Sequence, residues 1–98
     1  MQKLTPEEVQ VSLAMLDGWQ TDGSTIWKDY VFQDFRAAMS FMNKVAETAE
    51  QLNHHPDWSN SYNKVTLRLT SHDSGGLTDQ DFVLARAADT AAHTLIAD

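Results

Sequence analysis

The sequence predicts an α+β fold, a single domain over residues 1–98 in which three helices pack on one face of a four-stranded antiparallel sheet. Two observations lead to this fold class. First, the chain has 98 residues, enough for one hydrophobic core, and no linker or low-complexity stretch divides it. Second, the local patterns follow in the order helix-strand-strand-helix-strand-strand-helix, which gives two similar hairpin-plus-helix units without a sequence repeat.

The first helix is predicted from the signals at its start. Thr5 is a typical helix cap, Pro6 takes the first helical position, and Glu8 stands three residues after the cap. We expect this helix to end near residues 17–18.

A hairpin is predicted next, with strands at residues 19–21 and 26–32. Asp22 and Gly23 supply the positive φ angles that a tight turn between them needs. In the second strand both faces carry apolar residues. Because neither face is polar, we expect a partner subunit or a ligand to cover the second one. The first face holds Ile26, Tyr30 and Phe32, and the second holds Trp27 and Val31.

The second helix is predicted from apolar residues at helical spacing that begin at Phe35, with Asp34 as the cap. This helix must end near Asn53, because Pro56 moves His55 out of the α region and removes a backbone donor. The apolar positions are Ala38, Met39, Met42, Val45, Ala46, Ala49 and Leu52.

Two further strands are predicted at residues 58–62 and 64–70. In the second of them Val65, Leu67 and Leu69 alternate with polar residues, so we expect one buried and one exposed face.

The third helix is predicted to follow Thr78 and to run almost to the end of the chain. Leu77, Thr78, Asp81 and Phe82 repeat the pattern of a hydrophobic staple and a capping box.

Composition and charge exclude several classes of function. The formal net charge is -7 and the few Lys and Arg residues are scattered, so we expect no direct nucleic-acid binding. There are no cysteines, hence no disulfide and no thiolate metal site. We expect no membrane association and a cytoplasmic location, because no apolar run is long enough to span a bilayer and no secretion signal is recognisable.

Three histidines, His54, His55 and His72, fall at the ends of predicted elements, where functional sites usually lie. A neutral imidazole accepts a proton near neutral pH and an imidazolium donates one, so the three together indicate acid–base chemistry. The alternative is that His54 and His55 only cap the second helix. His93, inside the third helix, is expected at the surface or at an interface.

Two carboxylates have both a structural and a functional interpretation. Glu50 stands four residues before His54, so the two side chains meet if the helix continues; otherwise Glu50 forms a surface ion pair. Asp81 completes the capping box or orients a histidine, and both roles can coexist. Asp73 beside His72 raises the option of a metal site, but the histidine spacing matches no metal-binding pattern, so we expect none.

The histidine motif and three shorter motifs resemble the signature of the pterin-4a-carbinolamine dehydratases. The first motif, at residues 50–58, reads Glu-Gln-Leu-Asn-His-His-Pro-Asp-Trp. The others are Tyr-Asn-Lys-Val at residues 62–65, Thr-Ser-His-Asp at 70–73 and Gly-Leu-Thr at 76–78, followed by Asp81. The resemblance covers nearly the whole chain and implies one dehydratase-like domain.

The resemblance also implies which residues form the site. His54, His55 and His72 are expected to be catalytic, with Asp81 and Glu50 as supporting acids. Neither a metal nor another cofactor is expected. Relatives often carry Asp where this chain has Asn53. The residues expected to contact the substrate are Trp19, Asn53, His54, His55, Thr70, Ser71, His72 and Asp73.

The reaction implied is the removal of water from 4a-hydroxytetrahydropterin to give quinonoid dihydropterin, a step of tetrahydrobiopterin recycling. Elimination needs an acid for the departing hydroxyl and a base for the proton on N5. Our hypothesis is that His54 or His55 serves the hydroxyl while His72, held by Asp81, handles the other proton.

The partners implied are a pterin substrate, an aromatic amino-acid hydroxylase in the same pathway, and further copies of the chain in a homodimer or homotetramer. The doubly apolar strand and the small core agree with self-association. Some relatives act as dimerisation cofactors of a homeodomain transcription factor, so a protein-binding module is the alternative function.

Overall fold

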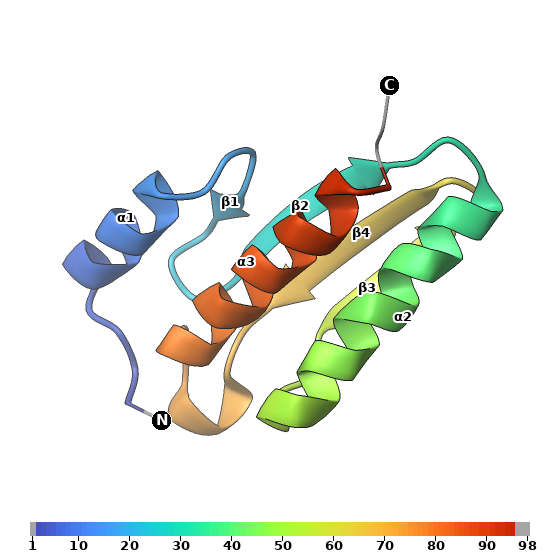
Figure 1. The fold of residues 1–98 in the computed structure, drawn as a ribbon. Coiled ribbons are helices and arrows are strands. Elements are labelled where there is room, and N and C mark those ends of the chain that lie inside the picture. The colour runs from blue at the N-terminus through green and yellow to red at the C-terminus, as the bar shows by residue number, and fades with distance from the viewer. Residues whose placement is uncertain (1, 96–98) are drawn as a thin grey trace.

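A computed structural model describes residues 2–95 and confirms the predicted fold class (Figure 1). The helices α2 and α3 lie side by side along one face of the sheet. In chain order the elements are α1 (Pro6–Ala14), β1 (Gln20–Thr21), β2 (Ile26–Val31), α2 (Phe35–Leu52), β3 (Asp57–Ser61), β4 (Lys64–Leu69), the short 3-10 turn η1 (His72–Ser74) and α3 (Asp79–His93).

The four strands form one antiparallel sheet in the order β1-β2-β4-β3. The two hairpins therefore join through β2 and β4 at the centre of the sheet. Ile26 lies opposite Leu69 and Tyr30 opposite Val65, so these buried side chains share one face. The predicted inward faces of both strands are confirmed.

The core lies between this face of the sheet and the helices. Burial of these apolar side chains away from water is the main favourable contribution to folding. The Phe41 ring of α2 packs 4.6 Å from the Tyr30 ring and 4.9 Å from the Phe32 ring. The helix α1 joins the same core through Val9, which is buried. The largest fully buried apolar side chains are Phe41, Phe82, Ile26, Leu67, Leu69, Leu77, Leu84, Val45 and Val65.

The predicted helix starts are confirmed by their caps. The Thr5 hydroxyl accepts from the Glu8 backbone N–H at 3.2 Å, and the Glu8 carboxylate accepts from the Thr5 N–H at 2.8 Å. The Asp34 carboxylate accepts from the Ala37 N–H at 2.9 Å and begins α2. Each of these bonds satisfies a backbone donor that has no partner inside the helix.

The end of α1 was predicted too late in the chain. The helix stops at Ala14 instead of near residues 17–18. The Met15 N–H bonds to the Ser12 carbonyl and the Leu16 N–H to the Leu13 carbonyl, so the chain tightens into bonds three residues apart. This tighter turn leads through Gly18, whose φ is 79°, to the buried Trp19.

The hairpin loop is longer than a two-residue turn. The Asp22 N–H bonds to the Thr25 carbonyl, and the Asp22 carboxylate accepts from the Ser24 N–H at 3.0 Å and the Thr25 N–H at 2.9 Å. The hydrogen bond from the Ser24 backbone lowers the pKa of Asp22. Gly23 adopts a positive φ of 101°, as predicted, but Asp22 does not.

The second face of β2 points away from α2 and α3. Val31 is 55% exposed there, and Trp27 is half-buried beneath Arg68, whose guanidinium lies 4.7 Å from the indole ring. The covering of this face by a partner or a ligand stays a prediction. Within residues 2–95, no helix has the length and apolar character that crossing a membrane requires.

Candidate active site

The end of α2, the segment after β4 and the start of α3 meet around a cavity of about 330 Å³. These segments are far apart in sequence but adjacent in space, because β3 and β4 return the chain beside the end of α2. The cavity collects every residue predicted to contact the substrate except Trp19. Its walls are formed by Asn53, His54, His55, Thr70, Ser71, His72, Asp73, Ser74 and Gln80.

A residue in the left-handed backbone conformation at the end of α2 sets the directions of the two histidines that follow it. Asn53 has φ 50° and ψ 44°, a conformation that Asn tolerates better than most residues. The His54 N–H then bonds back to the Ala49 carbonyl at 2.9 Å, which closes the helix end. The chain leaves the helix at this point and Pro56 leads it into β3.

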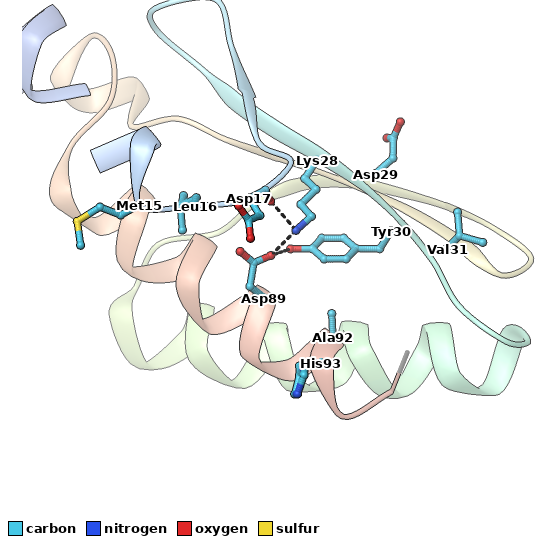
Figure 2. A pocket seen from close by; sticks show the side chains of 10 residues that line it. All are labelled: Met15, Leu16, Asp17, Lys28, Asp29, Tyr30, Val31, Asp89, Ala92 and His93. Carbon is cyan, nitrogen blue, oxygen red and sulfur yellow. Dashed lines mark hydrogen bonds and ion pairs between the residues drawn. The ribbon is translucent and has the colours of Figure 1, made fainter. Parts of the chain in front are cut away.

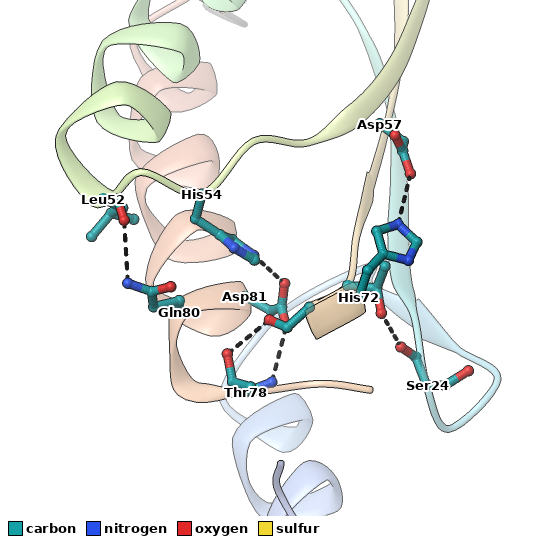
Figure 3. Close-up of polar contacts among 10 residues, drawn as sticks. Ser24, Leu52, His54, Asp57, His72, Thr78, Gln80 and Asp81 are labelled. Carbon is teal, nitrogen blue, oxygen red and sulfur yellow. Dashed lines mark hydrogen bonds and ion pairs between the residues drawn. The ribbon is translucent and has the colours of Figure 1, made fainter. Parts of the chain in front are cut away.

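The first histidine is held by a buried carboxylate (Figure 3). The Nε2 atom of His54 lies 2.6 Å from Oδ1 of Asp81, and the two side chains are 12% and 0% exposed. Oδ2 of Asp81 accepts from the Thr78 backbone N–H at 2.9 Å and from the Ser71 hydroxyl at 2.8 Å. Asp81 therefore contributes to the cap of α3 and contacts a histidine at the same time, so both of its predicted interpretations hold.

The second histidine is paired with the acid of α2. Nε2 of His55 lies 2.5 Å from Oε2 of Glu50, and both side chains are exposed. The expected contact between Glu50 and His54 is not formed. The helix does not continue through residue 54, since Asn53 turns the chain, and His55 rather than His54 folds back along α2.

The third histidine lies at the open side of the cavity. The His72 side chain is 82% exposed, and its Nε2 is 3.9 Å from Oδ2 of Asp57. The hypothesis that Asp81 holds His72 is wrong, because the buried Asp81 carboxylate faces His54 instead. The hydroxyl of the neighbouring Thr70 donates a hydrogen bond to the Ser24 carbonyl at 2.6 Å, which ties this wall to the β1–β2 loop.

Trp19 does not line this cavity. Its indole N–H donates to Oδ2 of Asp89 at 3.0 Å, and its ring packs edge-on against Tyr30. Figure 2 shows the rest of this cluster: Asp89 also accepts from Lys28 at 2.9 Å and from the Tyr30 hydroxyl at 2.5 Å. Trp19 therefore lies outside this cavity, and its contact with the substrate stays a prediction.

Two cavity residues were not among the predicted site residues. Gln80 donates its side-chain amide to the Leu52 carbonyl at 3.3 Å and so joins the start of α3 to the end of α2 (Figure 3). Ser74 comes from η1. Gln80 adjoins Asp81 in sequence, but its place in the wall depends on how two helices pack, which no local pattern reveals.

The cavity offers the groups of an acid–base site. An imidazole can accept or donate a proton, and the hydroxyls and the two side-chain amides of the cavity are hydrogen-bonding groups of the kind that orient polar ligands. Among residues 2–95, no cluster of three or more His, Asp or Glu side chains has an arrangement that would hold a metal ion.

Comparison with known proteins identifies the family. Residues 2–91 match the family model described as pterin 4 alpha carbinolamine dehydratase. The chain belongs to this dehydratase family. Two relatives provisionally carry the name pterin-4-alpha-carbinolamine dehydratase. One, from Sulfurisphaera tokodaii, is 46% identical over 91% of this chain and 96% of its own length. The other, from Koribacter versatilis, is 51% identical over 84% of this chain and 87% of its own length.

Solved structures agree with this dehydratase family. A crystal structure from Brucella melitensis, described as a transcriptional coactivator/pterin dehydratase, superposes with a TM-score of 0.89 at 41% identity. It covers 93% of this chain and 99% of the other. A pterin dehydratase-like protein described as a RuBisCO assembly factor in the alpha-carboxysome shares the fold, with a TM-score of 0.62 at 19% identity over 76% of this chain and 86% of its own.

Proposed function

We propose that this chain removes water from 4a-hydroxytetrahydropterin to give quinonoid dihydropterin. The observation that carries the proposal is the pairing of His54 with the buried Asp81 at the wall of a cavity that also contains His55 and His72. Membership of the dehydratase family supports the same reaction. The dehydration changes no oxidation state, so the proposed reaction needs no redox cofactor.

The hydrogen bond to Asp81 decides which nitrogen of His54 can act. A carboxylate only accepts hydrogen bonds. The hydrogen between the two groups is therefore bonded to Nε2 of His54, which donates it to Oδ1 of Asp81. Nδ1 is then the ring nitrogen left for the substrate. In neutral His54 it accepts a proton, and in the imidazolium it donates one.

The proton movements follow from the bonds that change. The C4a–O bond breaks and its oxygen leaves as water after receiving a proton, while N5 loses its proton and forms a double bond to C4a. In the proposal, Nδ1 of His54 takes the N5 proton, since Asp81 holds this ring in place. His72, with its exposed ring, or His55 supplies the proton to the leaving hydroxyl.

The experiment that tests the proposal follows the loss of 4a-hydroxytetrahydropterin absorbance, with the substrate generated in situ by an aromatic amino-acid hydroxylase. We expect wild type to accelerate the loss and His54→Ala to reduce the acceleration by about 10²-fold or more. His55→Ala and His72→Ala should each reduce it as well. The matched control is His93→Ala, which removes an exposed histidine outside this cavity. A folded wild type without any acceleration would refute the proposal.

The protein-binding alternative is supported by a separate observation. Phe35 and Met39 on α2 are 48% and 36% exposed, and the Brucella melitensis structure is described partly as a coactivator. We propose this as a second candidate function, carried by a helical face and independent of the histidines. If it holds, the histidine variants should bind a protein partner as wild type does, whereas Phe35→Glu should not.

The cellular setting belongs to the proposal as well. A cytoplasmic enzyme of this kind would act with an aromatic amino-acid hydroxylase, which forms the 4a-hydroxy compound, and would return its product to tetrahydrobiopterin recycling.

A further inference from the structure

The buried carboxylate of Asp81 has a partner on each oxygen. Oδ1 meets Nε2 of His54 at 2.6 Å. Oδ2 meets the Ser71 hydroxyl at 2.8 Å and the Thr78 backbone N–H at 2.9 Å. The position of Oδ1, and with it that of the His54 ring, therefore depends on the donors that hold Oδ2.

The hydroxyl bonds behind Asp81 run in one direction. The Ser71 and Thr78 hydroxyl oxygens are 2.9 Å apart, and the Ser71 hydroxyl donates its hydrogen to Asp81. A hydroxyl has one hydrogen to donate, so the Thr78 hydroxyl must donate to Ser71. The chain of donors thus runs from Thr78 to Ser71 to Asp81, and each bond polarises the next.

The backbone of Ser71 is fixed where this chain of donors needs it. The Ser71 N–H donates to the Gly76 carbonyl at 3.0 Å, and the Gly76 N–H donates to the Ser71 carbonyl at 3.3 Å. Ser71 is 8% exposed, although its neighbours Thr70 and His72 are more open to solvent. Its single hydroxyl hydrogen points inward to Asp81 and is not available to a ligand in the cavity.

We propose that Ser71 is a positioning residue rather than a substrate-binding one. Its hydroxyl holds the Asp81 carboxylate in the orientation in which Oδ1 faces Nε2 of His54, which keeps neutral His54 in the Nε2–H tautomer with Nδ1 as its reactive atom. The consequence for the rate rests on the proposed function. The consequence for the tautomer does not.

The kinetic test compares Ser71→Ala, Ser71→Cys and Ser71→Thr with wild type in the dehydratase assay. Ser71→Ala should lower kcat by about tenfold or more, as expected for losing a hydrogen bond to a charged group, with KM within about twofold. Ser71→Thr keeps the hydroxyl and should restore kcat. Ser71→Cys keeps a similar shape with a weaker donor and should fall between them, so it provides the test if Ser71→Ala does not fold. A loss seen mainly in KM would instead make Ser71 a substrate contact and overturn the proposal.

The second measurement is ¹⁵N NMR of the histidine rings at a pH where they are neutral, with His54 assigned by the signals lost in His54→Gln. Wild type and Ser71→Thr should show the Nε2–H tautomer, and Ser71→Ala or Ser71→Cys a mixture of tautomers. If wild type lacks dehydratase activity but has the Nε2–H tautomer, and Ser71→Ala or Ser71→Cys gives a mixture, the proposed function fails and the positioning role stands. If wild type is active and the Ser71 variants keep both its tautomer and its kcat, the positioning role fails and the proposed function stands.

Discussion

At the scale of single residues, the Asp81 carboxylate has several structural roles at once. One carboxylate contributes to the cap of α3, holds His54 and receives the Ser71 hydroxyl while it is fully buried. A buried carboxylate is tolerated only when its oxygens have partners. Stability and the proposed activity therefore depend on the same atoms.

Asp81→Asn should damage both properties. The amide keeps the size of the side chain but replaces one of the two acceptor oxygens with a donor NH₂ group. If that group takes the place of Oδ2, the donors that Oδ2 accepts from lose their partner. If it takes the place of Oδ1, His54 loses its acceptor or must change tautomer. We expect a loss of about 1–3 kcal/mol in the free energy of unfolding, measured in urea, and a rate lower by about 10²-fold. Asp79→Asn, two residues earlier and exposed, is the control. An unchanged rate in Asp81→Asn would contradict this account of the site.

The Tyr30 hydroxyl should make stability depend on alkaline pH. Burial raises the pKa of Tyr30 far above its ordinary value of 10.0, and the hydrogen bond to Asp89 raises it further. In the unfolded chain this hydroxyl ionises near pH 10, whereas in the folded chain it keeps its proton. The contribution of the Tyr30 hydroxyl to the free energy of unfolding is therefore complete below about pH 10. It is lost as the pH rises above that value, because the folded chain then binds more protons than the unfolded chain.

The measurement compares the free energies of unfolding of wild type and Tyr30→Phe in urea at about pH 9 and about pH 11. Wild type should lose more stability than Tyr30→Phe over this interval, by up to about 1.4 kcal/mol per pH unit above the unfolded pKa. Tyr62→Phe removes a tyrosine that is 64% exposed and should behave as wild type does. Equal losses in wild type and Tyr30→Phe would show that Tyr30 does not titrate in this way.

The residue types of the site could be predicted from the sequence, but their pairing could not. A contact between Glu50 and His54 would need a helix that continues through residue 54, two residues beyond its end at Leu52. The left-handed conformation of Asn53 ends the helix instead, which gives Glu50 to His55 and leaves His54 for Asp81. Periodicity describes a face of a regular helix and carries no information about directions beyond its end.

At the scale of elements, the ends of helices were predicted less well than their starts. Starts have side-chain signals such as Thr5, Asp34 and Thr78, and each marks the residue before a helix. The end of α2 was also predicted correctly, because Pro56 lies just beyond it. The end of α1 has no such breaker until Gly18, and backbone bonds end the helix earlier, at Ala14.

The turn at Asn53 should show its conformational cost on substitution. Asn53→Ala places a Cβ at φ 50° without the local hydrogen bonding of an Asn side chain, whereas Asn53→Gly removes the steric cost. We expect Asn53→Ala to be less stable than Asn53→Gly by about 1 kcal/mol, measured as a lower urea midpoint at equal m-value. Gln51→Ala, at an exposed position in α2, is the control. An alanine variant as stable as the glycine variant would mean that the left-handed turn is not maintained in solution.

At the scale of the whole molecule, the described chain leaves apolar side chains uncovered. Phe35 is 48% exposed on α2, and Val31 is 55% exposed on the face of the sheet away from α2 and α3. Exposed apolar side chains that gather into a contiguous patch mark interaction sites, and we predict that these two belong to contacts between subunits. The predicted homodimer or homotetramer would cover them, and this assembly remains a prediction.

Light scattering after size exclusion should therefore give wild type the mass of a dimer or a tetramer. Phe35→Glu should lower that mass, because it would place a charge in a contact between copies. Val11→Glu is the matched control, since Val11 is also an apolar residue and is 66% exposed, but on α1. A monomeric wild type at high concentration would contradict the prediction, and a lower mass in Val11→Glu but not Phe35→Glu would move the contact to α1.

The junction between the two hairpin-plus-helix units also affects the order of events during folding. His54 and His55 follow α2 of the first unit, whereas His72 and Asp81 come from the second unit. The contact between His54 and Asp81 joins residues 27 positions apart, and the contact between Leu52 and Gln80 joins residues 28 positions apart. Neither unit contains the complete site, and such non-local contacts form after the intervening chain has been ordered. During refolding, the helical signal should therefore return before the proposed dehydratase activity does. Recovery of that activity would then report the docking of the two halves rather than the formation of either one.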